Sequence, residues 1–221
     1  MKNLLGGSAS AVLVAALALC GPATTNAQVV VGSIYENNAA ASNAVIGFTH
    51  GAADVTFSVP SPTNPACTGA FAGDTLCFQS GSLYTLGEFL TSGGATVLTG
   101  AGELSHTADN AVYEFTGNVT VTHGQTFQAG HDDGLQLMIG STLVIDAPGP
   151  TGFTTTPATY NGPSGTFAFD LVYGECCGAP ADLGIALPLV STPPVPEPES
   201  YALMLAGLGV LGATVRRRRS R

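Results

Sequence analysis

Short runs in which apolar and polar residues alternate dominate the middle of this 221-residue chain. Alternation with a period of two places successive side chains on opposite faces of an extended strand. The clearest example is Leu135–Ile139, which is followed by the pair Gly140-Ser141 and then by Thr142–Asp146. A two-residue loop that begins with glycine is typical of a type II′ hairpin. Thr166–Tyr173 also alternates, with its apolar side chains on one face, so this part of the chain is predicted to be β-sheet.

Similar runs recur along the chain, separated by Gly, Pro, Asn and Asp, and no segment shows a long helical period. The strands predicted from them are Val45–Thr49, Asp54–Val59, Thr75–Ser80, Val112–Phe115, Asn118–Thr122, Thr126–Ala129, Leu135–Ile139, Thr142–Asp146, Thr166–Tyr173 and Leu183–Leu187. Ser82–Leu90 fits either a strand or one helical turn, and Ala147–Gly165 is predicted to be a long loop. Many short strands at this spacing predict an all-β fold, either a sandwich or a barrel.

The first 27 residues carry the features of a secretory signal peptide. Lys2 is followed by the unbroken apolar run Ala11–Leu19, and a small-residue cleavage site ends at Ala27. Such a segment is removed on export, which predicts a mature chain that begins at Gln28. Lipoprotein processing at Cys20 is the alternative. It is disfavoured because a leucine precedes Cys20, where a small residue is expected.

All five arginines of the chain lie in its last six residues, after a Pro-Glu-Pro triplet and the apolar stretch Tyr201–Val215. That stretch would span about 22 Å as a helix, whereas a bilayer core requires about 20 residues. The arginines would remain on the cytoplasmic side of the membrane. The tail is therefore better suited to a transient hold than to a permanent anchor. The residues concerned are Pro196, Glu197, Pro198, Arg216, Arg217, Arg218, Arg219 and Arg221.

This order of elements resembles the PEP-CTERM protein-sorting signal of Gram-negative bacteria. The resemblance implies that an exosortase recognises the chain near the triplet, after a transient hold in the inner membrane, and that the protein reaches the cell surface or the medium. Hosts of such tails often make exopolysaccharide. On this interpretation, residues 191–199 are a Pro-rich linker with the PEP motif, and residues 200–221 are the sorting helix with its arginine cluster. An ordinary C-terminal membrane anchor is the alternative.

Between the two ends lie about 165 residues, enough for one domain with a real core. This part contains no Lys or Arg, but it holds 13 of the 15 acidic residues, from Glu36 to Asp182. Such a surface argues against nucleic acid and anionic lipid as partners, because both require cationic side chains. It favours cations and uncharged partners such as glycans. The alternative is that the charge only keeps an extracellular surface soluble.

Four cysteines, Cys67, Cys77, Cys176 and Cys177, remain after the signal peptide. An exported protein meets an oxidising compartment, so two disulfides are expected. Four cysteines allow three connectivities. Either Cys67 pairs with Cys77 and leaves a vicinal Cys176–Cys177 bridge, or one of two other pairings ties the first loop to the second. The spacing does not suggest a zinc site.

The segment 113–188, about 75 residues long, resembles the PA14 domain and its GLEYA-type adhesin relatives. The residues that carry the resemblance are Asp132-Asp133-Gly134, Ile139-Gly140, Val144-Ile145-Asp146 and Tyr173-Gly174-Glu175. The resemblance implies a PA14-like β-sandwich within residues 28–190. Residues 28–110 do not share it, so they either complete the same sandwich or form a separate lobe.

In the PA14-like adhesins, an Asp-Asp pair joined by a cis peptide holds Ca²⁺, and the ion coordinates sugar hydroxyls. The resemblance therefore implies that Asp132 and Asp133 bind metal and sugar. Ca²⁺ takes about 6–8 oxygen ligands, so further oxygens are required from Glu175 or Asp182, from carbonyls of the turn 176–178, and from the sugar. In the alternative, both aspartates only cap backbone N–H groups of a turn.

Two residues near the aspartate pair also have simpler interpretations. Glu175 is alternatively a solvated or hydrogen-bonded loop residue. His131 is expected to lie at the surface and not to bind metal.

Catalysis has little support in the sequence, which lacks the nucleophile elbow, the zinc-protease motif and the phosphate-binding loop. A single adjacent pair of aspartates is weak evidence for a glycosidase, whose carboxyl groups lie about 5–9.5 Å apart across a cleft. We therefore expect no enzyme. We expect an exported, surface-displayed protein that binds glycan or exopolysaccharide, with Ca²⁺ as its cofactor. The alternatives are a structural matrix protein without a specific ligand and, less favoured, a glycoside hydrolase.

Overall fold

The computed structural model describes residues 29–60, 67 and 69–190. Three predicted segments lie outside these residues: the signal peptide at 1–27, the linker with the PEP motif at 191–199, and the sorting helix at 200–221. Their predictions are therefore untested by the fold.

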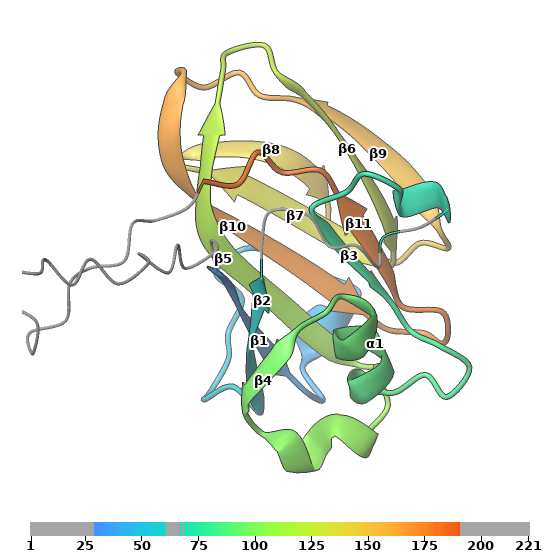
Figure 1. Ribbon diagram of the computed structural model, residues 1–221. Coiled ribbons are helices and arrows are strands. Elements are labelled where there is room, and N and C mark those ends of the chain that lie inside the picture. Colours follow the sequence, from blue (N-terminus) through green and yellow to red (C-terminus); the bar gives the residue numbers. More distant parts are fainter. Residues whose placement is uncertain (1–28, 61–66, 68, 191–221) are drawn as a thin grey trace, which may run out of the picture.

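Two antiparallel sheets form the described part of the chain (Figure 1). The larger sheet has the strand order β4-β2-β1-β5-β10-β7-β8, and the smaller has the order β3-β11-β6-β9. The strands are β1 Val29–Tyr35, β2 Val55–Pro60, β3 Leu76–Gln79, β4 Thr96–Thr99, β5 Ala111–Val121, β6 Thr126–Asp132, β7 Gly134–Ile139, β8 Thr142–Ala147, β9 Thr154–Thr159, β10 Gly165–Glu175 and β11 Asp182–Ile185. The helical elements are α1 Leu86–Ser92 and the 3₁₀ turns η1 Ala39–Ser42, η2 Gly69–Phe71 and η3 Ala101–Ser105. The prediction of an all-β sandwich is confirmed.

The core lies between the two sheets and is built by strands with the predicted alternation. On β10, Phe169, Leu171 and Tyr173 are buried on the inner face. They pack in one cluster with side chains of β5, β7, β11 and α1. Burial of each large apolar side chain contributes about 1.5–3 kcal/mol relative to exposure. The alternation therefore fixes which face of each strand turns inward.

The predicted hairpin at residues 135–146 is present. Ile139 pairs with Thr142 across the loop. Gly140 has a φ of 59°, and Ser141 is not among the described residues with positive φ. This sign pattern is that of a type II′ turn.

Residues 82–90, for which strand and helix were both open, contain the start of α1. The Thr85 side chain accepts a hydrogen bond from the Glu88 amide, and Gly93 follows the last turn. The Thr85 and Glu88 spacing matches a capping box, which favours a helix start. The helix buries Leu86, Phe89 and Leu90, and the Phe89 ring lies 4.6 Å from that of Tyr113, centroid to centroid.

The described residues between 29 and 110 complete the same sandwich. In the larger sheet, β1 pairs with β5, and in the smaller sheet, β3 pairs with β11. The choice between a shared sandwich and a separate lobe, which the sequence left open, is thereby resolved. The described cysteines form the pairs Cys67–Cys77 and Cys176–Cys177.

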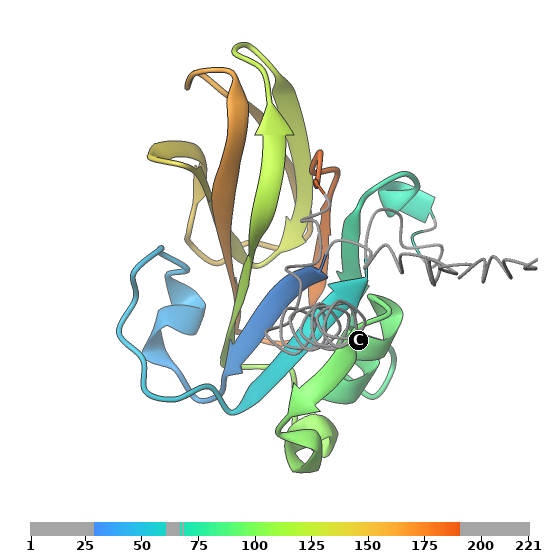
Figure 2. The same ribbon diagram turned by 60° about the vertical axis from the view of Figure 1, so that its left-hand side comes forward.

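The strand predicted at Val45–Thr49 is wrong. This segment contains turns and irregular backbone, and its apolar residues cover the outer face of the larger sheet. Ala44 and Phe48 pack there against Tyr35 and Val172. Figure 2 shows this covering segment, in light blue, on the opposite side of the larger sheet from α1.

Other strand boundaries also differ from the prediction. Val112–Phe115 and Asn118–Thr122 belong to one long strand, β5. The predicted loop Ala147–Gly165 contains β9, which pairs with β6 along its whole length. Neither β1 nor β4 was predicted. The predicted strand at Leu183–Leu187 ends at Ile185, where β11 ends.

Candidate metal and glycan site

Asp132, Asp133 and Glu175 meet at one end of the sandwich. Asp132 ends β6, Asp133 lies between β6 and β7, and Glu175 ends β10. Since Gly174 of β10 pairs with Gly134 of β7, the register places Glu175 beside Asp133. One oxygen from each of the three carboxyl groups lies within 4.8 Å of the other two. The structure thus brings together the three residues that were predicted to bind metal.

A cavity of about 340 Å³ adjoins the aspartate pair. Its lining consists of Asp132, Asp133, Pro150, Thr151, Gly152, Cys176, Cys177, Gly178 and Ala179. The peptide bond between Asp132 and Asp133 is cis, as the family resemblance implied. Gly134 is required beside the pair because a Cβ at this position would overlap the carbonyl oxygen of Pro148.

Asp133 joins the two loops that border the cavity. Its Oδ1 accepts a 2.8 Å hydrogen bond from the Thr151 amide, and its Oδ2 accepts one of 3.0 Å from the Cys176 amide. These are caps of the kind that the turn interpretation predicted. Each carboxylate oxygen has two lone pairs, so these two hydrogen bonds leave further lone pairs available. Asp133 is therefore both a structural cap and an available oxygen donor.

Asp132 lies on the outer face of β6, directly opposite Asp182 of β11 in the strand register. Its carboxylate accepts a hydrogen bond from the Phe153 amide. Burial, and then the charge of Asp133, raises the pKa of Asp132. Burial also raises the pKa of Asp182, whose carboxylate accepts a bond from Gln79. Each of these groups lacks a cationic partner, since residues 29–190 contain no Lys or Arg.

Glu175 is completely buried. Its Oε1 lies 2.6 Å from the Tyr84 hydroxyl, and its Oε2 lies 2.5 Å from the Tyr173 hydroxyl. Burial raises the pKa of Glu175 to about 9, although the two tyrosine hydrogen bonds act in the opposite direction. As an alternative to a metal ligand, Glu175 was expected to be either solvated or hydrogen-bonded. The structure agrees with a hydrogen-bonded residue and not with a solvated one.

The Tyr173 hydroxyl also contacts the main-chain carbonyl of Asp132. A tyrosine hydroxyl carries one hydrogen, so it donates to only one of its two acceptors. A protonated Glu175 resolves the conflict, because it donates to Tyr173, and Tyr173 then donates to Asp132. The half-buried Tyr84 and the fully buried Tyr173 and Glu175 thus form a support behind the aspartate pair.

The expectation that His131 lies at the surface is wrong. His131 is 1% exposed, because it alternates on β6 with the outward-facing Asp132. Its Nδ1 contacts the Asp133 carbonyl, and its Nε2 lies 2.7 Å from the Thr156 hydroxyl. Burial lowers the pKa of His131, so the ring is neutral, with Nδ1 as donor and Nε2 as acceptor. Its role is to hold the backbone of the pair.

Two other groupings of potential ligands are present in the described part of the chain. Cys176 and Cys177 lie near Asp133, but their sulfurs form a disulfide and are not thiolate ligands. Glu36, Glu103 and His106 form an ion-pair cluster at the surface, with the His106 Nδ1 2.8 Å from Glu36. No pattern in the sequence indicated this cluster, nor the positions of Tyr84, Thr151 and Phe153 around the aspartates.

Solved structures that are similar to this chain include PA14 domains. A PA14 sugar-binding domain from an RTX adhesin is 19% identical, with 73% of this chain and 90% of that chain covered and a TM-score of 0.48. The PA14 domain of the MpAFP antifreeze protein is 19% identical, with 73% and 81% covered and a TM-score of 0.46. An anti-sigma factor domain-containing protein is 16% identical, with 78% and 50% covered and a TM-score of 0.42. No curated protein matches the sequence.

No helix within residues 29–60, 67 and 69–190 is both long and apolar enough to cross a membrane. Residues 194–219 match the family model of the PEP-CTERM protein-sorting motif. The match contains the Pro-Glu-Pro triplet, the apolar stretch and the four consecutive arginines. The chain therefore carries a PEP-CTERM sorting motif, which implies processing by an exosortase and export to the cell surface.

Proposed function

We propose that this exported protein binds surface glycan or exopolysaccharide through a Ca²⁺ ion held by Asp132 and Asp133. The observation that carries the proposal is the pairing of two nearly buried carboxylates, 7% and 4% exposed, beside a cavity of about 340 Å³. The cavity is large enough to admit part of a sugar, at the lower end of the range for small-molecule sites.

A cation is the natural complement of this pair. Two carboxylates at close range repel each other unless a cation, a proton or hydrogen-bond donors neutralise them. No lysine or arginine lies between residues 29 and 190. Backbone amides from Thr151, Cys176 and Phe153 supply part of the compensation, and a bound divalent ion would supply the rest.

Ca²⁺ suits the available donors better than a softer metal. It prefers oxygen ligands and takes about 6–8 of them. The two aspartates provide carboxylate oxygens, and the turn formed by residues 176–179, which lines the same cavity, provides candidate main-chain carbonyls. The remaining coordination positions are left for water or for two adjacent hydroxyls of a sugar ring.

Direct binding of the metal by Glu175 remains an untested prediction. We propose instead that Glu175 supports the aspartate pair. Both of its oxygens already contact tyrosine hydroxyls, and Tyr173 links Glu175 to the Asp132 carbonyl. Glu175 therefore positions the pair from behind. The substitution Glu175→Gln tests this role: it keeps the shape and the hydrogen bonds, so calcium affinity is expected to change little, whereas a direct ligand would lose much of it.

Retention on immobilised polysaccharide tests the function. The oxidised protein is passed over a glucan, a mannan and a galactan, with calcium and then with a chelator. We expect calcium-dependent retention on at least one of them and its loss in the double variant Asp132→Asn/Asp133→Asn. The matched control, Asp146→Asn/Glu103→Gln, removes two charges from more exposed positions and should bind normally. Absence of retention on any glycan would instead favour a structural matrix protein, and turnover of a glycan would favour a hydrolase.

A further inference from the structure

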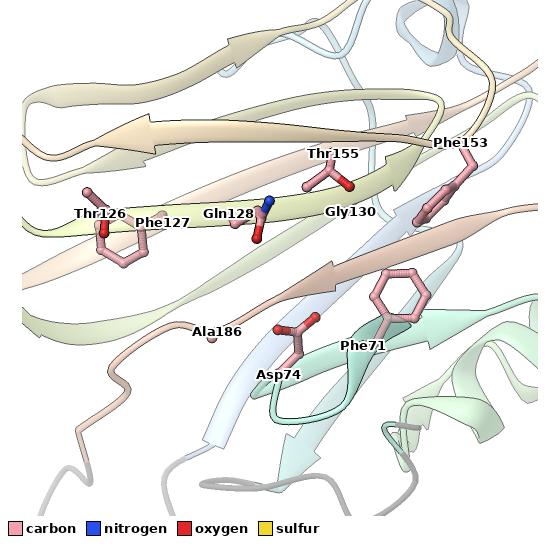
Figure 3. A pocket seen from close by; sticks show the side chains of 9 residues that line it. All are labelled: Phe71, Asp74, Thr126, Phe127, Gln128, Gly130, Phe153, Thr155 and Ala186. Atoms are coloured by element: carbon pink, nitrogen blue, oxygen red, sulfur yellow. The ribbon is translucent and has the colours of Figure 1, made fainter. Parts of the chain in front are cut away.

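A second cleft lies on the outer face of the smaller sheet, separate from the aspartate pair. Its volume is about 280 Å³. Figure 3 shows Phe71 and Phe153 at one end of the cleft, with Asp74 near Phe71 and Gln128 farther along, next to Phe127. The full lining is Phe71, Asp74, Thr126, Phe127, Gln128, Gly130, Phe153, Thr155 and Ala186.

Two glycines on neighbouring strands make room for this cleft. Gly130 of β6 and Gly184 of β11 lie directly opposite each other. A Cβ at Gly184 would overlap the Phe71 ring, and a Cβ at Gly130 would lie 2.7 Å from it. The Phe71 ring thus packs on the two glycines. The Cys67–Cys77 disulfide links the loop that carries Phe71 to β3.

The two phenylalanines have different roles. Phe71 is 3% exposed and forms part of the wall, whereas Phe153 is 47% exposed. Their rings meet edge to face, with centroids 5.7 Å apart. Phe153 therefore has a fixed position and still presents apolar ring surface to a ligand.

The polar groups of the cleft are hydrogen-bonding groups without a cation. Within the described residues, no hydrogen-bond donor contacts the Asp74 carboxylate, and burial is the cause that raises its pKa, to about 6. Gln128 contributes an exposed amide, and Thr126 and Thr155 line the same cleft. A ligand here must supply hydroxyl or other donors to Asp74 and an apolar face to Phe153.

We propose that this cleft is a second saccharide-binding site, which holds one uncharged sugar ring against Phe153 with hydroxyls directed to Asp74 and Gln128. A pyranose ring has a C–H face for the aromatic ring and hydroxyls at its edge. The cleft volume lies near the lower limit of about 300 Å³ for small-molecule pockets, which fits a single ring. The choice of a sugar as ligand rests on the proposed function, but the site itself requires no calcium.

The loop between the two sites connects them. Pro150, Thr151 and Gly152 line the cavity at the aspartate pair, and Phe153, the next residue, lines the cleft. Phe153 also donates its amide to Asp132. The two sites thus share one short segment, so a glycan chain that binds at one of them is delivered close to the other.

Saturation-transfer NMR with methyl glucoside, methyl mannoside and methyl galactoside tests the proposal in the presence of a chelator. We expect at least one glycoside to bind. Phe153→Ala should weaken this binding by about tenfold, the upper range for a well-placed aromatic contact. Leu143→Ala, which removes another exposed apolar side chain, is the matched control and should have no effect.

A second variant tests whether weaker glycoside binding results from unfolding and not from loss of the Phe153 ring. Thr155→Phe fills the cleft from a strand position where aromatic residues are favoured, and it should abolish binding in a protein that remains folded. Glycoside binding should also be the same when calcium replaces the chelator, because this cleft requires no calcium. Calcium-dependent polysaccharide binding that survives both cleft variants, without any glycoside binding under chelator, would overturn this proposal and leave the calcium site intact. Tetramethylammonium, a cation, is tested as an alternative ligand for Asp74 and Phe153. Stronger binding of this cation than of every glycoside would also overturn the proposal.

Discussion

Asp170 offers a direct test of how burial and charge determine stability in this fold. It lies on the outer face of β10, opposite Thr116 of β5 and Met138 of β7. Its Oδ1 is buried, and no partner for it exists in the described part of the chain. Burial, and then the charge of Glu114, raises the pKa of Asp170 from 3.8 to about 6. The folded protein therefore binds a proton at Asp170 more tightly than the unfolded chain does.

The sign of the effect follows from this difference. Below pH 3.8 the carboxyl is protonated in both states, so it has no ionisation cost. As the pH rises to about 6, the unfolded chain loses its proton first, and the folded state loses stability relative to it. The rise in pKa corresponds to about 3 kcal/mol, which partial solvent exposure reduces to about 1–2 kcal/mol. Asp170→Asn, which removes the charge and keeps the shape, should therefore stabilise the protein by about 1–2 kcal/mol at pH 7.5.

Urea unfolding at pH 3.5 and pH 7.5 measures this effect. We expect the gain at pH 7.5 and no gain from charge removal at pH 3.5. Asp146→Asn removes a carboxylate from an exposed position on β8 and should change stability by less than about 0.5 kcal/mol. No gain from Asp170→Asn at pH 7.5, or the same gain at both pH values, would show that burial of the Asp170 charge does not destabilise the folded protein.

Further predictions concern the backbone at the site and the helix α1. Gly134→Ala places a methyl group against the Pro148 carbonyl and should destabilise the protein by about 1–3 kcal/mol, measured by thermal unfolding. The calcium affinity of this variant should also fall. If Gly134→Ala is as stable as the wild type, the loop 148–152 does not pack against Gly134. Thr85→Ala removes the cap on the Glu88 amide and should lower the free energy of unfolding by about 1 kcal/mol, measured in urea. Thr85→Ser keeps a hydroxyl and should retain most of this free energy. Equal losses in the two Thr85 variants would mean that packing of the Thr85 methyl group, and not the cap, is responsible.

Much of the fold was predictable because several strands have one buried and one exposed face. The hairpin 135–146 and the strand that includes Phe169 and Leu171 follow directly from alternation. By contrast, β9 has the sequence TTTPAT, with exposed or half-buried residues throughout, so its side chains carry no inward-facing pattern. Val45–Thr49 has the reverse problem, because its apolar residues cover the outside of a sheet without joining it.

The candidate site was predictable only in part. The Asp132-Asp133-Gly134 motif indicated the position of the pair, and Glu175 was associated with it through the family resemblance. Tyr84 was not, because it lies 91 residues from Glu175 in sequence and belongs to the part of the chain without a resemblance. His131 was misplaced because the inward-facing set of β6 cannot be assigned until its partner strands are known. The groups that support a site thus depend on the fold more than the groups that line it.

Calorimetry measures whether Asp132 and Asp133 bind calcium. The oxidised protein, the Asp132→Asn/Asp133→Asn variant and the Asp146→Asn/Glu103→Gln control are each titrated with CaCl₂ after removal of bound metal. We expect one site in the wild type and in the control, with a dissociation constant of about 10⁻⁴–10⁻³ M or tighter, as in extracellular calcium modules, and no site in the aspartate variant. Equal binding by all three proteins, or no binding by the wild type at about 10 mM calcium, well above that range, would show that the aspartate pair is not a calcium site.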